Sequence, residues 1–218
     1  VRKEQDRWRC LAFDQAILEI LTEVHISPFG VVDKGDSDPL TAGRTIHDLS
    51  FPVGRSINDH TDSASMCAPT FETCDAIATE ILLRQHAHPS AEVKLQAGDV
   101  ASAFRNTCTR SDCAYLFGGR LEPDNALAIG LAAAFGWSGS PATYGIVGGA
   151  IAFIHGVSSN LFQPRGLFNY YWVDDHINVA ADVGSNCADA YISLRNAMIT
   201  VLGDGAINEG QFTPWSTR

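Results

Sequence analysis

The chain has 218 residues, of which 45% are hydrophobic and 18% charged, so it can bury a substantial core and is not expected to be disordered. That length suits one large domain or two small ones. No apolar run in the sequence approaches the ~20 residues that cross a bilayer, and no signal peptide opens the chain, so no membrane partner is expected. The net charge of −10 argues against a nucleic-acid-binding surface spread over the whole chain, because phosphate contacts need lysine and arginine.

The charges are unevenly distributed along the chain. Residues 1–120 hold 12 of the 15 basic residues, whereas residues 121–218 hold three, against eight acidic residues. A basic front half and an acidic back half would suit a protein that binds phosphates in one place and metal in another. Scatter in surface charge is the alternative.

The ends of the chain and its cysteines bear on its origin. The first residue is Val1 rather than Met, so we expect a piece of a longer polypeptide. The six cysteines form no CxxC pair, and no histidine lies at zinc-finger spacing from them. We therefore expect reduced, mostly buried thiols in an intracellular protein of the nucleus or the cytoplasm.

The first part of the chain predicts helices on either side of a hairpin. A stripe of apolar residues predicts an amphipathic helix over 2–24. Strand-forming residues over 31–32 and 44–49, separated by a polar turn, predict the hairpin. A second helix is expected over 70–87, with Thr70 as its N-cap.

The rest of the chain alternates between helix and strand signals without a regular βαβ rhythm, which favours an α+β fold. The elements expected there are a strand over 92–98, a helix beginning near 101–104, a strand over 115–117, a strand or helix over 127–135, a small-residue loop over 136–141, helices over 142–155 and 187–201, and a final strand over 212–215.

Two adjacent carboxylates stand out in the stretch 169–179. Aromatic and β-branched residues flank Asp174 and Asp175, which predicts two short strands joined by a tight turn that holds both acids. Because the two carboxylates repel each other, a divalent cation is expected beside them. The alternative is ordinary turn chemistry, since aspartate is a common turn former.

A third carboxylate, Asp99, follows the strand expected over 92–98 and precedes Asp174 by 75 residues. The two side chains can meet if their strands belong to one sheet. Two carboxylates side by side would hold two Mg²⁺ ions about 4 Å apart, an arrangement that clamps the attacking and leaving oxygens of a phosphoryl transfer. Magnesium suits so sparse a set of ligands, because it retains waters and binds substrate phosphates.

Three segments in order resemble the reverse transcriptases of retroelements. Residues 98–104 (GDVASAF) look like that family's first metal-binding segment, 135–142 (FGWSGSPA) like its Gly-rich template and nucleotide loop, and 172–175 (WVDD) like its aromatic-x-Asp-Asp box. The spacings from Asp99 to Gly136 and from Gly136 to Asp174 are 37 and 38 residues, which also suit the family. The resemblance covers nearly the whole chain.

The resemblance implies an α+β fold with reverse-transcriptase-like fingers (about 1–72 and 107–139) and palm (about 73–106 and 140–218), built on a central antiparallel sheet packed on helices. It implies template-directed DNA synthesis from deoxynucleoside triphosphates. The partners would be an RNA or DNA template with its primer and the remainder of a retroelement polyprotein.

The resemblance also implies roles for single residues. Asp99 and Asp174 would be the main ligands of two Mg²⁺ ions, or of Mn²⁺ instead, with Asp175 a weaker ligand and the backbone carbonyl of Val100 a further one. Lys34 and Arg44 lie in segments similar to the fingers hairpin and would meet the incoming triphosphate; the planar fork of arginine can donate to two phosphate oxygens. For Lys34 a solvated turn lysine is the alternative.

Phe104 would stack under the sugar and exclude a 2′-hydroxyl, with plain core packing as its alternative. Gly136 and Gly139 would let the backbone approach the bases, unless the segment is an ordinary helix-entry loop. Phe135 and Pro141 complete the expected nucleotide and template set.

Several features depart from the family pattern. Trp172 stands where tyrosine or phenylalanine is usual, and residues 207–215 lack a lysine that could donate a proton to pyrophosphate. The chain stops at Arg218, before the family's primer grip, thumb and RNase H, so we expect weak polymerisation by this piece alone. Phe135, together with 44–52, favours a retrotransposon over a retrovirus.

Two other classes of protein compete with this interpretation. One is a decayed or repurposed palm-fold protein that still binds nucleic acid; the missing lysine favours it, whereas the three intact acids oppose it. The other is a palm enzyme such as a nucleotide cyclase. A cyclase needs no template groove, so the Gly-rich loop and the hairpin count against it.

Overall fold

The computed structural model describes residues 2–33 and 43–217. The chain divides into two compact units, Val1–Cys67 with Phe104–Thr143, and Ala68–Ala103 with Tyr144–Arg218. We call them unit 1 and unit 2. Both combine helices with antiparallel strands, which confirms the predicted α+β class.

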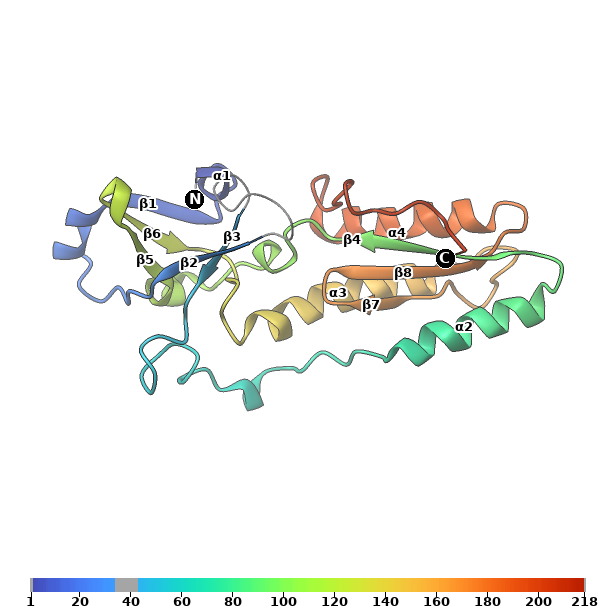
Figure 1. Cartoon of the computed structure of the whole chain (residues 1–218), viewed down its shortest axis with the longest axis horizontal. Coiled ribbons are helices and arrows are strands. Elements are labelled where there is room, and N and C mark those ends of the chain that lie inside the picture. The colour runs from blue at the N-terminus through green and yellow to red at the C-terminus, as the bar shows by residue number, and fades with distance from the viewer. Residues whose placement is uncertain (1, 34–42, 218) are drawn as a thin grey trace. The chain divides into compact units, whose positions relative to one another are not determined.

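Unit 1 is built on an antiparallel sheet of order β1-β6-β5 and a separate hairpin, β2-β3 (Figure 1). The strands are β1 (Cys10–Asp14), β2 (Phe29–Asp33), β3 (Gly43–His47), β5 (Gly118–Leu121) and β6 (Ala126–Gly130), preceded by a short helix α1 (Arg2–Gln5). The hairpin agrees with the sequence prediction, because Val31 pairs with Thr45 and Val32 with Arg44.

The core of unit 1 lies where the hairpin meets the segments that precede β5 and follow β6. Leu49, Phe117 and Ala134 are buried together, and Trp137 packs against them. The buried ring of His47 lies 3.1 Å from the carbonyl oxygen of Gly118, measured from Nε2, and so ties β3 to β5.

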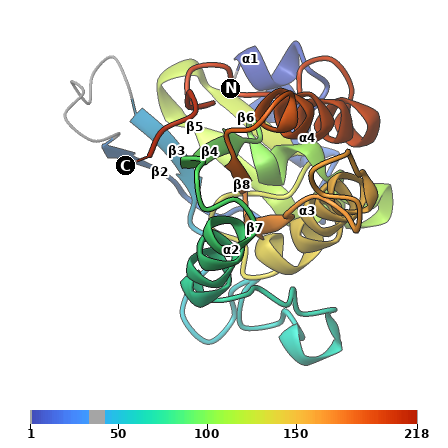
Figure 2. The same ribbon diagram turned by 90° about the vertical axis from the view of Figure 1, so that its right-hand side faces the viewer.

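Unit 2 is built on an antiparallel sheet of order β4-β8-β7 with three helices. The elements are α2 (Cys74–Ala87), β4 (Val93–Asp99), α3 (Ser140–Val157, whose first turn belongs to unit 1), β7 (Tyr170–Trp172), β8 (Asp175–Ala181) and α4 (Asn186–Leu202). Helices α3 and α4 lie together on one side of the sheet, and α2 runs along the strands on another side (Figures 1 and 2).

The register of the β4-β8 pair decides which side chains share a face. Asp99 pairs with Asp175, Gly98 with His176 and Gln96 with Asn178. Directly opposed residues of an antiparallel pair point to the same face. Gln96 and Asn178 accordingly form a side-chain hydrogen bond of 3.3 Å, and Gly98 faces Leu194 of α4.

The helix predicted over 2–24 is wrong. Helix α1 ends at Gln5, Trp8 adopts a left-handed backbone with φ 57°, and residues 10–14 form β1. The hydrophobic periodicity that predicted the helix is a local feature of the sequence. Strand β1 instead forms because it pairs with β6, more than 100 residues later in the chain. Tertiary pairing outweighs an amphipathic pattern when the backbone hydrogen bonds of a neighbouring strand are available.

Two short strand predictions are also wrong. Residues 115–117 belong to a 3-10 helix, Ser111–Phe117, and residues 212–215 form no strand. The C-terminal segment instead follows the edge of β4 away from β8, where an isolated bridge joins Leu95 to Ser216 and the Thr213 amide donates to the carbonyl oxygen of Ala97. Short apolar runs carry too few residues to separate a strand from a tight helical turn.

The thiols and the helices bear on two further predictions. All six cysteines lie in the described ranges and are free, but only Cys10 is buried, so the expectation of mostly buried thiols is wrong. Within residues 2–33 and 43–217, no helix has both the length and the apolarity needed to span a bilayer.

Two histidines are buried in unit 2, behind the sheet. His155 of α3 and His176 of β8 are each 2% exposed, and His155 Nδ1 lies 3.0 Å from the hydroxyl oxygen of Ser193 on α4. Burial lowers the pKa of His155. Burial, with the nearby His155 as a lesser cause, lowers the pKa of His176 to about 3. The interior therefore holds both rings neutral.

Acidification is expected to destabilise the fold through these rings. Because the pKa of His155 is lower in the folded chain, the unfolded chain takes up a proton first, and stability falls as the pH drops below about 6.5. Each such histidine contributes a slope of up to about 1.4 kcal/mol per pH unit. Urea unfolding between pH 7.5 and 5 should show a shallower decline for His155→Gln than for the wild type. The same change at the exposed His86 should leave the decline unaltered, and equal declines for all three proteins would contradict the prediction.

Candidate active site

The three predicted acidic residues lie at one end of the unit 2 sheet. Asp99 is the last residue of β4 and is 7% exposed, and it pairs directly with Asp175, the first residue of β8. The two residues therefore point to the same face of the sheet. This face is opposite the one on which Gly98 meets Leu194 of α4.

The hairpin that carries the other acids has a two-residue turn. Trp172 pairs with Asp175, so the turn consists of Val173 and Asp174, which corrects the expectation that both acids occupy it. Val173 has φ 54°, a conformation that β-branched residues rarely adopt and that two-residue hairpin turns usually assign to asparagine or glycine. Backbone strain of this kind gathers at functional sites.

A hydrogen bond fastens the turn to the end of β4. The amide nitrogen of Val100 donates to the backbone oxygen of Asp174 over 3.0 Å. Val100 follows Asp99 directly and is 1% exposed, so the bond is shielded from water. The strained turn and the end of β4 are thereby held in one fixed arrangement.

The electrostatics at this end are those of clustered negative charge. Asp175 is an exposed residue, yet the surrounding protein partly desolvates its carboxyl, which raises its pKa, and the neighbouring Asp174 charge raises it further. Among the described residues, no lysine or arginine forms an ion pair with Asp174 or Asp175. A cation at this place would relieve the repulsion.

Sequence reasoning missed Tyr144, in the first turns of α3. Its side chain is fully buried, and its pKa is raised by burial first and then by the charges of Asp174 and Asp99. The phenol therefore stays protonated at neutral pH and adds no negative charge beside the acids. The available signal was an aromatic residue shortly after the Gly-rich loop, but its position beside the acids depends on the tertiary fold.

The ligand set can be compared with what a metal requires. In the described ranges, no group of three or more histidine, cysteine, aspartate or glutamate side chains gathers closely enough to form a protein cage for a metal ion. Magnesium needs no such cage, because one or two carboxylates complemented by waters and substrate phosphates suffice. Carboxylate oxygens on a single face, as the pairing of Asp99 with Asp175 provides, fit this hard cation.

The Gly-rich loop of unit 1 is held by Asn58, another residue that sequence reasoning missed. Its side-chain nitrogen donates to the carbonyl oxygen of Gly136 over 2.8 Å, and its side-chain oxygen accepts from the amide of Ser138 over 2.8 Å. The indole of Trp137 donates to the Thr61 hydroxyl over 3.0 Å. The loop is thereby fixed before any ligand binds.

Packing within unit 1 explains why this loop needs its glycines. A Cβ at Gly136, where φ is +112°, would lie 1.9 Å from the carbonyl oxygen of His47. A Cβ at Gly139 would lie 2.4 Å from the Trp137 ring. The backbone therefore approaches β3 and the indole closely, and the expected approach to bases stays a prediction.

The other expected substrate residues lie in or near unit 1. Phe104 and Phe135 pack with ring centroids 5.0 Å apart, so Phe104 has a packing role whatever else it does. Pro141 is the second residue of α3, a position that suits its fixed φ. Arg44 belongs to β3, whereas Lys34 lies outside the described residues. The structure thus places the three acids at one end of the unit 2 sheet, and the loop residues with Phe104 in unit 1.

Comparisons with known proteins identify the fold alone. No protein-family model matches the chain, and no curated protein matches it. A solved structure of the foamy viral protease-reverse transcriptase in complex with double-stranded DNA matches with a TM-score of 0.56 and 13% sequence identity. The match covers 94% of this chain and 28% of the viral one, so this chain spans less than a third of that protein. The fold is reverse-transcriptase-like, as the sequence predicted.

Proposed function

We propose that the chain is the fingers and palm of a retrotransposon reverse transcriptase, which synthesises DNA from deoxynucleoside triphosphates on an RNA or DNA template. The observation that carries the proposal is the pairing of Asp99 with Asp175 across β4 and β8, beside a strained turn that presents Asp174. Three acids lie at one end of an antiparallel sheet, in a chain with a reverse-transcriptase-like fold, and this combination favours phosphoryl transfer as the reaction.

The carboxylates of Asp99 and Asp174 would hold two Mg²⁺ ions, with Asp175 and the carbonyl of Val100 as weaker ligands. When bound, the two ions supply a clamp for the attacking and leaving oxygens of a phosphoryl transfer. The protein contributes rigidity, because the Val100–Asp174 backbone bond and the β4-β8 register fix where the acids lie. The protonated phenol of Tyr144 limits the negative charge behind them.

The unit 1 residues would bind the substrate strand and nucleotide. The loop fixed by Asn58 would present its backbone to the template, and Arg44 and Lys34 would meet the triphosphate. Positioning of this kind supplies much of the rate in phosphoryl transfer, since the protein performs little covalent chemistry. We also propose that the protein acts inside the cell and that the chain is one part of a retroelement polyprotein.

Primer extension by the parent polypeptide tests the proposal. With Mg²⁺, a primed RNA template and deoxynucleotides, the primer should lengthen, and a template of defined sequence should dictate the product. Binding of primer–template without extension, under any divalent cation, would instead favour the repurposed palm-fold protein. Formation of cyclic nucleotides from triphosphates without a template would favour the cyclase.

Phe104 is expected to exclude ribonucleotides. Phe104→Ala should admit ribonucleoside triphosphates, lowering the discrimination between the two sugars at least about tenfold, because the ring is proposed to occupy the space of a 2′-hydroxyl. The ratio of kcat/KM for the two nucleotides measures it, with Phe104→Tyr as a control that retains the ring. Unchanged discrimination, accompanied by a lower melting temperature from the lost Phe135 contact, would assign Phe104 to packing.

A further inference from the structure

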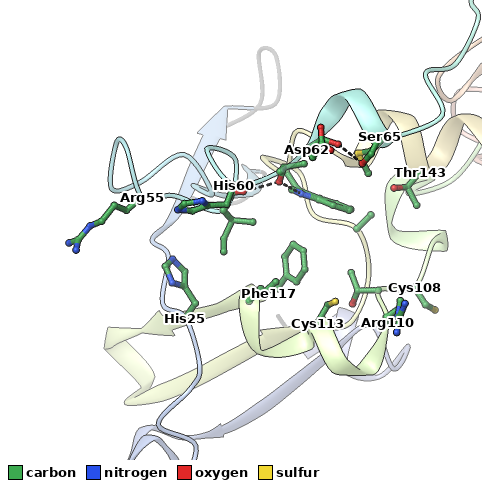
Figure 3. A pocket seen from close by; sticks show the side chains of 17 residues that line it. His25, Arg55, His60, Asp62, Ser65, Cys108, Arg110, Cys113, Phe117 and Thr143 are labelled. Carbon is green, nitrogen blue, oxygen red and sulfur yellow. Dashed lines mark hydrogen bonds between the residues drawn. The ribbon is translucent and has the colours of Figure 1, made fainter.

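A cavity of about 730 Å³ lies within unit 1 (Figure 3), and Trp137 of the Gly-rich loop is among the residues that line it. Its walls come from four separate stretches of sequence: His25 before β2, residues 55–66 after β3, residues 108–117, and residues 133–143, which hold the Gly-rich loop and the start of α3. The volume lies in the range of pockets that take ligands of drug size.

The body of the cavity is apolar. Ile57, Met66, Leu116, Phe117 and Trp137 line it. The rings of Phe117 and Trp137 meet edge to face, with centroids 5.5 Å apart, and the bond from the indole to Thr61 holds Trp137 in place. A rigid aromatic wall of this kind suits a flat, apolar ligand.

Two polar atoms in residues of the lining have no hydrogen-bond partner in the described part of the chain. They are Nε2 of His25 and the hydroxyl oxygen of Thr109, and both are buried from solvent. A buried polar atom without a partner loses its interaction with water and gains nothing in return. Because neither atom is accessible from the cavity as it stands, a ligand would be held by the apolar wall and by the charge at the rim.

One end of the cavity is basic. Figure 3 shows His25, Arg55 and His60 grouped at one side, with the Arg55 side chain extending outward from the rim. Among the described residues, no carboxylate forms an ion pair with Arg55, whereas Arg110 at the other side is already bound to Asp112. An anionic group at the rim would therefore meet an uncompensated guanidinium.

We propose that this cavity binds a small aromatic anion. The fused or linked rings lie against Phe117 and Trp137, and the anionic group lies at the rim beside Arg55. Shape and apolar lining select this class of ligand, and the charge at Arg55 places the anionic group at that rim, away from the Asp62 carboxylate, which also lines the cavity and accepts from the Ala64 amide. The proposal stands apart from the polymerase activity, because it concerns unit 1 alone.

Titration of the full chain with 8-anilinonaphthalene-1-sulfonate, an aromatic anion that fluoresces in apolar surroundings, tests the proposal. Saturable binding to one site is expected. Cys113→Phe places a ring in the cavity wall and should weaken binding at least about tenfold, whereas Cys67→Phe adds the same ring outside the lining and should not. Arg55→Glu should weaken binding several-fold, and Arg120→Glu, also outside the lining, should have no effect.

Alkylation provides a second readout that does not depend on a variant. The bound probe should slow the reaction of N-ethylmaleimide with Cys113, measured by mass spectrometry, and leave the exposed Cys67 unprotected. Equal protection of both thiols, or unchanged binding by a folded Cys113→Phe, would overturn the site. Uncharged N-phenyl-1-naphthylamine should bind more weakly than the sulfonate, and Arg55→Glu should not change its affinity. If it binds as tightly as the sulfonate, the anionic part of the proposal is wrong.

Discussion

Asp174→Asn is expected to lower the rate of primer extension by the parent polypeptide by about three orders of magnitude or more, which corresponds to about 4 kcal/mol of transition-state stabilisation. The change replaces a negatively charged carboxylate with a neutral amide. The backbone of this residue is fixed by the hydrogen bond from Val100 and by the β7-β8 turn. Nothing in the described structure could move a replacement carboxylate into the same place, because Asp99 and Asp175 are already set by the register of β4 and β8.

The fold should survive this substitution, which separates loss of chemistry from loss of structure. The raised pKa of Asp175 means that its charged form is disfavoured in the folded state, so the stability linked to this group falls as the pH rises through its folded pKa. Removing the Asp174 charge relieves part of that penalty. The melting temperature of Asp174→Asn at neutral pH should therefore equal or exceed that of the wild type.

Two further measurements make the prediction sharp. Asp204→Asn, the same change at an exposed turn of unit 2, should leave extension unaltered. In the protein without added metal, a titration of Asp175 by nuclear magnetic resonance should show a lower pKa in Asp174→Asn than in the wild type. Extension at the wild-type rate by Asp174→Asn would remove the carboxylates from the proposed chemistry.

The end of unit 2 that holds the three acids could be anticipated from sequence because its signals are local. The aromatic and β-branched residues around Asp174 formed a hairpin, and the strand over 92–98 became β4, ending at Asp99. The position of the turn was off by one residue, since turn preferences favour aspartate over valine. Only pairing of Trp172 with Asp175 places Val173 at the tip, in a strained conformation that composition does not reveal.

The remaining differences arise from long-range contacts. The strand β1 exists because β6 offers it a partner, and the hydrophobic periodicity of residues 2–24 carries no information about that pairing. Asn58 and Tyr144 likewise gain their roles from neighbours distant in sequence, the loop at Gly136 in one case and the acids Asp99 and Asp174 in the other. Such contacts become visible only when the chain is folded.

Gly136→Ala is expected to destabilise unit 1 by at least about 3 kcal/mol, a large share of the 5–15 kcal/mol typical of a whole domain. Two effects combine at this position. A backbone with φ +112° is unfavourable for any residue with a Cβ, and that Cβ would lie 1.9 Å from the carbonyl oxygen of His47. His47 cannot retreat easily, because its amide is bonded to the carbonyl of Phe135 and its ring lies against Gly118.

Two other glycines of unit 1 separate these effects. Gly54 has φ +82° with open space around its Cβ position, so Gly54→Ala should show the conformational strain alone, about 1–2 kcal/mol. Gly30, in β2, has neither a positive φ nor a close neighbour, and Gly30→Ala should be near neutral or slightly stabilising. Urea unfolding of the three variants should rank them in that order, with Gly136→Ala the least stable. If Gly136→Ala is no less stable than Gly54→Ala, then β3 and the loop can move apart without a loss of unfolding free energy. The glycine would then not be required by packing, and template binding would remain as the reason for it.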